Sequence, residues 1–122
     1  MKGRVRSALS AWASSERQDQ EALRSEYEDD EGTEWVRDIR DREIASVCGT
    51  LRTVTLRPSA GIPVLEAELY DGTGTVVIVW LGRRRISGIK PGRSLRVRGR
   101  VSAHGDAAGK FVMYNPHYEL LP

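Results

Sequence analysis

The segment from residue 64 to residue 81 constrains the fold most, because two strand-like runs meet there at one glycine-rich turn. Apolar and polar residues alternate over residues 65–70, which is typical of a strand with one face in the core and the other in water. Residues 71–74, Asp-Gly-Thr-Gly, tolerate the positive φ angles of a tight turn, and residues 75–81 are apolar and β-branched. The hairpin predicts a small, curved β domain.

The composition is that of a single globular domain, with 122 residues, of which 39% are hydrophobic and 30% are charged. Cys48 is the only cysteine, which excludes an intrachain disulfide and a cysteine-rich metal site and favours a reducing compartment. The first residues are basic, but serines and then Glu16 interrupt the apolar run that a signal peptide needs. No run reaches the roughly 18 apolar residues of a membrane span. We therefore expect a cytoplasmic protein with no membrane partner.

The two parts of the chain differ in charge. Residues 1–45 hold 8 Lys and Arg against 12 Asp and Glu, a net charge of −4, whereas residues 46–122 hold 11 against 5, a net charge of +6. We expect an acidic leader over residues 1–42 and a basic β domain over residues 43–122. The acidic run at residues 28–31 is either a solvated tether or a segment that competes with nucleic acid for the basic domain.

Helical patterns occur before the β domain. Val5, Leu9 and Trp12 form a narrow apolar stripe at helical spacing, and residues 21–27 are good helix formers. Trp35 and Ile39 suggest one or two further helical turns. The sequence thus predicts a leader that is helical or partly disordered.

The rest of the chain predicts three more strands. Residues 46–56 alternate around Gly49, and a glycine in the middle of a strand often marks a bend that lets one strand serve two sides of a barrel. Residues 94–101 alternate apolar residues with arginines, and residues 110–121 form a last strand with an irregularity at Pro116. A short helix fits between residues 82 and 93. Five strands in this order are expected to form a Greek-key barrel of the oligonucleotide/oligosaccharide-binding (OB) fold, in a mainly β protein.

Short motifs at corresponding positions along this barrel resemble a known family. The sequence is similar to the wedge OB domain of the RecG branch-migration helicase and, more broadly, to the anticodon-binding-type OB family and stand-alone bacterial OB proteins. The resemblance covers about residues 43–122 and rests on five segments: 47–51, 65–74, 79–81, 89–92 and 113–121.

The resemblance implies binding of DNA or RNA by a barrel without catalysis, since the helicase motor is missing. The sequence has no Gly-rich Lys-Ser/Thr loop for nucleotide phosphates. It departs from the wedge family at Leu81, where that family typically has an aromatic residue, which puts strand separation by base stacking in doubt.

Single-strand binding needs cations that follow the phosphates and aromatic faces on which bases stack. The candidate residues are Arg52, Arg57, Trp80, Arg83, Arg84, Arg85, Arg96, Arg98, Arg100, Lys110 and Tyr114. Arg83 to Arg85 either bind a ligand or solubilise the surface, and the three arginines at 96–100 either bind an anion or pair with Glu66, Glu68 or Glu119. Trp80 and Tyr114 are either stacking platforms or packing residues. Glu66 and Glu68 repel phosphates on the usual OB face, which favours a site displaced toward residues 83–100.

Evidence for catalysis is thin, so we expect neither an enzyme nor a cofactor or metal. His104 and His117 lack the paired spacing of a metal site, and Cys48 has no histidine nearby in the sequence. The leading hypothesis is a non-catalytic protein that binds single-stranded or branched DNA, or RNA, with low sequence specificity. The alternative is a protein-interaction module or oligomerising scaffold that docks a partner or a second copy through the stripe at residues 5–12.

Overall fold

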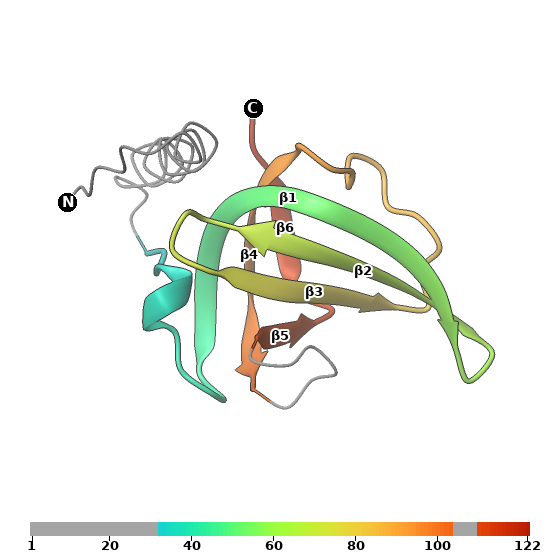
Figure 1. The fold of residues 1–122 in the computed structure, drawn as a ribbon, viewed down its shortest axis with the longest axis horizontal. Coiled ribbons are helices and arrows are strands. Elements are labelled where there is room, and N and C mark those ends of the chain that lie inside the picture. The colour runs from blue at the N-terminus through green and yellow to red at the C-terminus, as the bar shows by residue number, and fades with distance from the viewer. Residues whose placement is uncertain (1–31, 104–109) are drawn as a thin grey trace, which may run out of the picture.

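The computed structural model describes residues 32–103 and 110–122, and it is mainly β (Figure 1). The strands are β1 (Ile44–Ser59), β2 (Ile62–Tyr70), β3 (Thr75–Leu81), β4 (Ser94–Ser102), β5 (Phe111–Tyr114) and β6 (His117–Leu120). A single 3-10 turn, η1 (Val36–Asp38), precedes them. No helix among the described residues has the length and apolar character needed to cross a bilayer. The helices predicted over residues 5–12 and 21–27 lie outside the described residues, as do residues 104–109. The helical turns predicted at Trp35 and Ile39 are reduced to the 3-10 turn η1, which these two residues flank.

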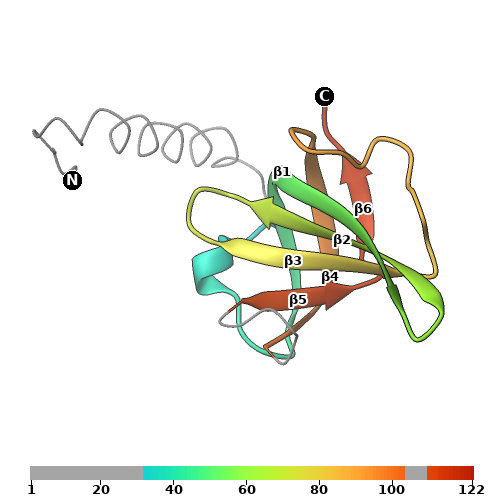
Figure 2. The same cartoon turned by 45° about the vertical axis from the view of Figure 1, so that its right-hand side comes forward.

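All six strands belong to one mixed sheet in the order β1-β2-β3-β5-β4-β6, and β1 also pairs with β4. The extra pairing closes a ring of five strands, in which β3 and β5 are parallel and the other pairs are antiparallel. β6 lies outside this ring and pairs with β4 alone. Figure 2 shows β1 curving over the other strands, with β6 beside β4.

β1 serves both sides of the ring because it bends near Gly49. Its first half pairs with β4 up to Thr50, and its second half pairs with β2 from Thr50 onward. A Cβ at position 49 would lie 2.7 Å from the carbonyl oxygen of Tyr70, so only glycine permits this approach. A register shift between Leu51 and Thr53 adds a bulge directly after the bend. The predicted role of a mid-strand glycine agrees with this geometry.

The short helix predicted between β3 and β4 is wrong. Residues 82–93 form turns instead, in which the amide of Ile89 donates to the carbonyl of Ile86 and the amide of Arg93 donates to the carbonyl of Lys90. Ile86 and Ile89 are both buried in the core. Gly88 and Gly92 adopt positive φ angles, which interrupt a helix but suit these turns. The connection thus contributes two apolar side chains to the core without forming a helix.

The last predicted strand is divided into β5 and β6, which raises the expected five strands to six. Asn115 has a φ of +50°, and its amide donates to the carbonyl of Val79 at 2.7 Å. Its side-chain oxygen accepts from the amide of Leu81 at 3.0 Å. The buried Pro116 packs against Gly99, where a Cβ would lie 3.1 Å from the proline Cβ. These contacts turn the chain away from β3 after Tyr114.

The segment before β1 is fastened to the β2–β3 turn by a buried carboxylate. Asp71 is 0% exposed and accepts hydrogen bonds from the amide of Val36 (2.8 Å), from the amide (2.8 Å) and hydroxyl (2.7 Å) of Thr73, and from the amide of Gly74 (3.1 Å). The buried side chains of Val36 and Ile39 join the core cluster. Asp71 therefore shapes the turn and holds residues 36–39 against the sheet.

We expect Asp71→Ala to lower the free energy of unfolding by about 2 to 4 kcal/mol, because it leaves buried amide donors without an acceptor. Urea denaturation followed by circular dichroism measures the loss. The control is Asp41→Ala, which removes one exposed bond to the amide of Ala103 and should cost less than about 1 kcal/mol. Equal losses in the two variants would contradict the anchoring role of Asp71.

Candidate nucleic-acid interface

The β2–β3 face, where OB barrels usually bind oligonucleotides, is largely neutralised here. The guanidinium of Arg57 pairs with the carboxylate of Glu66 at 2.9 Å, and the amine of Lys110 pairs with that of Glu68 at 2.9 Å. Both cations are among the predicted binding residues, and both carboxylates were expected to repel phosphates. Because each charge has an opposite neighbour, this face offers little net attraction to a polyanion.

The same face is apolar beneath its ion pairs. Val64, Val77, Val79 and Val112 form a second buried cluster there. Tyr114 lies opposite Val79 in the register and is 48% exposed, so its ring is available to a partner. Tyr70 is buried, and the guanidinium carbon of Arg52 lies 3.5 Å from the centre of its ring. The structure therefore ties Arg52 to a tyrosine of the same sheet.

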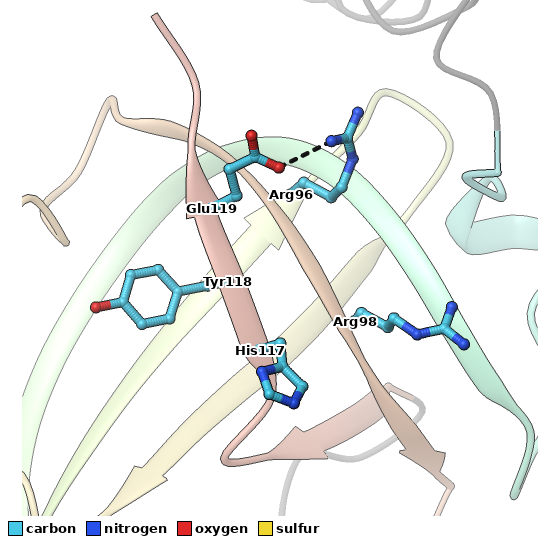
Figure 3. Close-up of a pocket in the computed structure, with 5 residues that line it drawn as sticks. All are labelled: Arg96, Arg98, His117, Tyr118 and Glu119. Carbon is cyan, nitrogen blue, oxygen red and sulfur yellow. Dashed lines mark hydrogen bonds and ion pairs between the residues drawn. The ribbon is translucent and has the colours of Figure 1, made fainter.

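The outer face of β4 carries the predicted row of arginines, because Leu95, Val97 and Val101 point into the core between them. We call Arg96, Arg98 and Arg100 the β4 arginine row. Figure 3 shows Arg96 and Arg98 extending from β4 on the side of β1, with His117, Tyr118 and Glu119 on the neighbouring strand β6. These five residues line a shallow hollow of about 280 Å³.

The three arginines of this row have different partners. Arg96 forms an ion pair with Glu119 at 2.9 Å, the pairing that we weighed against ligand binding. Arg98 donates to the hydroxyl of Ser46 at 3.1 Å, and Arg100 donates to the carbonyl of Arg42. Within the described part of the chain, Arg98 and Arg100 therefore have neutral oxygen acceptors and no carboxylate. Their positive charges remain uncompensated there.

The second open group of cations is Arg83 to Arg85, at the start of the β3–β4 connection. All three are exposed, and no acidic side chain of the described ranges pairs with them. The connection runs beside β6 in Figure 2, and Gly88 is close enough to Leu120 that a Cβ would lie 2.5 Å from its Cδ1. The connection that begins with Arg83 to Arg85 thus passes the end of β6 at Gly88, and the β4 arginine row lies on the strand that pairs with β6.

The aromatic candidates divide between core and surface. Trp80 is 3% exposed and belongs to the core cluster, so its ring is not presented to a base in this structure. Its ring meets that of Tyr118 edge-on, with centroids 5.9 Å apart. Its indole N–H is buried without a hydrogen-bond acceptor. Because Trp80 follows Ile78 by two residues in β3, the strand period places both on the core face.

Tyr118 was not predicted as a site residue, although it is 39% exposed and lines the hollow with Arg96 and Arg98. The register partner of Tyr118 on β4 is the buried Val97. Paired residues point to the same side of a sheet, so Tyr118 shares the side of Val97 and not that of the β4 arginine row. Residues 110–121 were predicted as one strand with an irregularity at Pro116, so the separate strand β6 and its pairing with β4 were not expected. His117 also lines the hollow and was considered only as a metal ligand.

Glu34 lies beside the start of β1. The backbone amide of Glu34 donates to the carbonyl of Ser46 at 2.8 Å. Burial raises the pKa of Glu34, and a hydrogen bond and the negative charge of Glu43 raise it further. Carboxylates therefore crowd one another where the chain enters β1.

The described residues contain no group of three or more His, Cys, Asp and Glu side chains arranged to hold a metal ion. The interface consists of cations, a few aromatic rings and hydrogen-bonding oxygens. Such an arrangement binds anions through charge and hydrogen bonds.

Comparison with solved structures finds a match to RecG bound to a three-way DNA junction, with a TM-score of 0.60 and 20% sequence identity. The match covers 74% of this chain and 12% of that chain, so this protein spans a small part of RecG's length. The likeness shows a shared fold, in agreement with the resemblance to the RecG wedge domain. No protein-family model matches the sequence, and no curated protein matches it.

We expect Trp80→Ala to lower the free energy of unfolding by about 3 to 5 kcal/mol, because it leaves a large cavity in the core. Tyr114→Ala, at a half-exposed ring, should cost less than about 1 kcal/mol. Chemical denaturation of both variants, followed by circular dichroism, provides the comparison. A Trp80→Ala variant as stable as the wild type would show that the indole is not a core residue.

Proposed function

We propose that this chain is a non-catalytic protein that binds single-stranded or branched DNA, or RNA, with low sequence specificity. The observation that carries the proposal is a set of arginines without a carboxylate partner among the described residues: Arg98 and Arg100 on β4, and the exposed Arg83 to Arg85 in the connection that leads from β3 to β4. Cations in such a cluster attract phosphates and release their counterions. RecG, whose fold this chain shares in part, is bound to a three-way DNA junction in its solved structure.

We assign the closed ring of five strands to the OB barrel, whose strand order β1-β2-β3-β5-β4-β1 it shares. The binding surface that we propose is displaced from the usual β2–β3 face toward β4, β6 and the β3–β4 connection. The ion pairs of Glu66 and Glu68 support the displacement, because they neutralise the charges of the β2–β3 face and leave no free cation of these pairs for a phosphate. We also place the protein in the cytoplasm, where the buried thiol of Cys48 stays reduced.

Low specificity follows from the chemistry of the surface. Guanidinium groups bind the phosphates, which are the same for every sequence. The exposed rings of Tyr114 and Tyr118 offer stacking to any base. Contacts of both kinds distinguish strand shape and flexibility more than base identity.

The second candidate function, a protein-interaction module, has one observation in its favour. Ile62 and Leu81 are about half exposed beside the buried Val64, and Tyr114 is exposed on the same face. Exposed apolar side chains of this kind occur at protein interfaces. A partner on this face would leave the β4 arginine row accessible, so the two functions are separable by mutation.

We expect Arg98→Ala/Arg100→Ala to weaken binding of a labelled 20-nucleotide single strand at least tenfold at low salt. The magnitude of the slope of log K against log salt should fall by about 1.4, because two phosphate contacts to a single strand are lost. Fluorescence anisotropy at several salt concentrations measures both quantities. A three-way junction, a duplex and a single-stranded RNA serve as competing ligands that rank the preference.

The matched control is Arg37→Ala/Arg40→Ala, which removes the same charge from exposed positions on the segment before β1. It should change the affinity less than threefold. Equal effects of the two double variants would mean that only net charge matters. No binding by the wild type at low salt would refute nucleic-acid binding and direct attention to a protein partner of the apolar face.

A further inference from the structure

The point at which the acidic leader joins the described structure lies beside the β4 arginine row. Residues 28–31, Glu-Asp-Asp-Glu, carry four carboxylates and end directly before Gly32. Two residues later, the amide of Glu34 donates to the carbonyl of Ser46 at 2.8 Å. Gly32 and Thr33 alone separate the acidic run from Glu34 in the sequence.

Ser46 connects this point to the arginines. It is the register partner of Arg98, and its hydroxyl accepts a hydrogen bond from the Arg98 guanidinium at 3.1 Å. The same residue therefore contacts the incoming chain through its carbonyl and the β4 arginine row through its side chain. In Figure 3, Arg96 and Arg98 extend from β4 on the side of β1, the strand that Glu34 joins.

The β4 arginine row is chemically suited to carboxylates. Glu119 already pairs with Arg96 at 2.9 Å, which demonstrates the fit of a carboxylate on this face. Arg98 and Arg100 donate only to neutral oxygens within the described residues. The acidic segment supplies four negative charges and precedes Glu34 by only a few residues. Glu34 and Arg98 both bond to Ser46, so the segment and these cations are complementary in charge and are joined through one residue of β1.

We infer that the β4 arginine row is the docking surface of the chain's own acidic segment, residues 28–31, which competes there with nucleic acid. This inference rests on the proposed function and adds its regulation. A short tether gives the segment an effective concentration of the order of millimolar, so even weak pairing occupies the arginines. Phosphates must displace the carboxylates, which weakens binding and raises selectivity for ligands with dense phosphate charge.

The test is the full chain with Glu28→Gln, Asp29→Asn, Asp30→Asn and Glu31→Gln. Without the competitor, affinity for the labelled single strand should rise about tenfold at low salt. The gain should shrink as salt increases, since salt already screens the wild-type pairing. A second readout needs no nucleic acid: the side-chain Nε–H NMR signals of Arg98 and Arg100 should move between wild type and variant.

The matched control neutralises Glu16, Asp19, Glu21 and Glu26, which changes net charge equally but lies farther from Gly32. It should raise affinity less than threefold. The gain from neutralising residues 28–31 should also vanish in an Arg98→Ala/Arg100→Ala background, because the shared surface is then gone.

The outcomes separate the two proposals. If the wild type binds DNA and the neutralised variant binds it equally well with unmoved arginine signals, the docking inference is wrong and the proposed function stands. If neither the wild type nor any variant binds nucleic acid, the proposed function is wrong. If the NMR signals of Arg98 and Arg100 nevertheless move in the neutralised variant, the acidic segment docks on the β4 arginine row without competing with nucleic acid. Equal gains from the control and the test variant would also overturn docking, because general charge would explain both.

Discussion

The closed ring depends on how closely β1 passes the end of β2 at Gly49. A Cβ there would lie 2.7 Å from the carbonyl oxygen of Tyr70 and 3.0 Å from Cγ of Leu69, distances that side chains do not adopt. At this position β1 leaves β4 and joins β2, so one strand holds together two sides of the ring. Without the close approach at Gly49, β1 could not pair with both β4 and β2, so β4 would lose its pairing with β1 or change its orientation relative to β2. The direction of every arginine on β4 therefore follows from a missing side chain on β1.

The outer surface of the ring differs electrostatically between β2 and β4. On β2, the outward positions are glutamates, and residues from β1 and the segment before β5 reach across to pair with them. On β4, the outward positions are arginines, and only Glu119 on β6 supplies a carboxylate from the described residues. Like charges spaced two residues apart on a strand repel one another, so the excess on β4 is a cost to the free protein that a polyanion relieves.

Much of the fold could be predicted because strand alternation is a local signal. The strands around residues 64–81 and 94–101 were predicted nearly to the residue, and Gly49 was recognised as a bend. The connection between β3 and β4 was misread, because its length leaves room for a helical turn but Gly88 and Gly92 adopt positive φ. The last strand was misread because Asn115 bonds to both Val79 and Leu81, contacts that depend on the neighbouring strand.

The site was harder to predict than the fold, because its charges pair between strands. In the ion pairs Arg57–Glu66, Arg96–Glu119 and Lys110–Glu68 the partners are 9, 23 and 42 residues apart. The sequence alone does not indicate which cation each carboxylate neutralises. Trp80 illustrates a related difficulty: the strand period placed it on the core face, but its position at the end of β3 was equally consistent with a surface ring. The structure decides between the two, because Trp80 is 3% exposed within the core cluster and its ring meets that of Tyr118 on β6.

The geometry of Arg98 gives a physical reason for the site to favour phosphates over any particular base. A guanidinium has five N–H donors in a fixed plane, and within the described residues Arg98 uses one nitrogen to bond the Ser46 hydroxyl. That bond restricts the side chain before a ligand arrives, so less rotamer entropy is lost on binding. The donors that remain match the paired oxygens of a phosphate or a carboxylate equally well. On the proposed function, such a surface distinguishes ligands by the density of their negative charge. Its selectivity also depends on the competition between phosphates and the carboxylates of the chain for the same guanidinium groups.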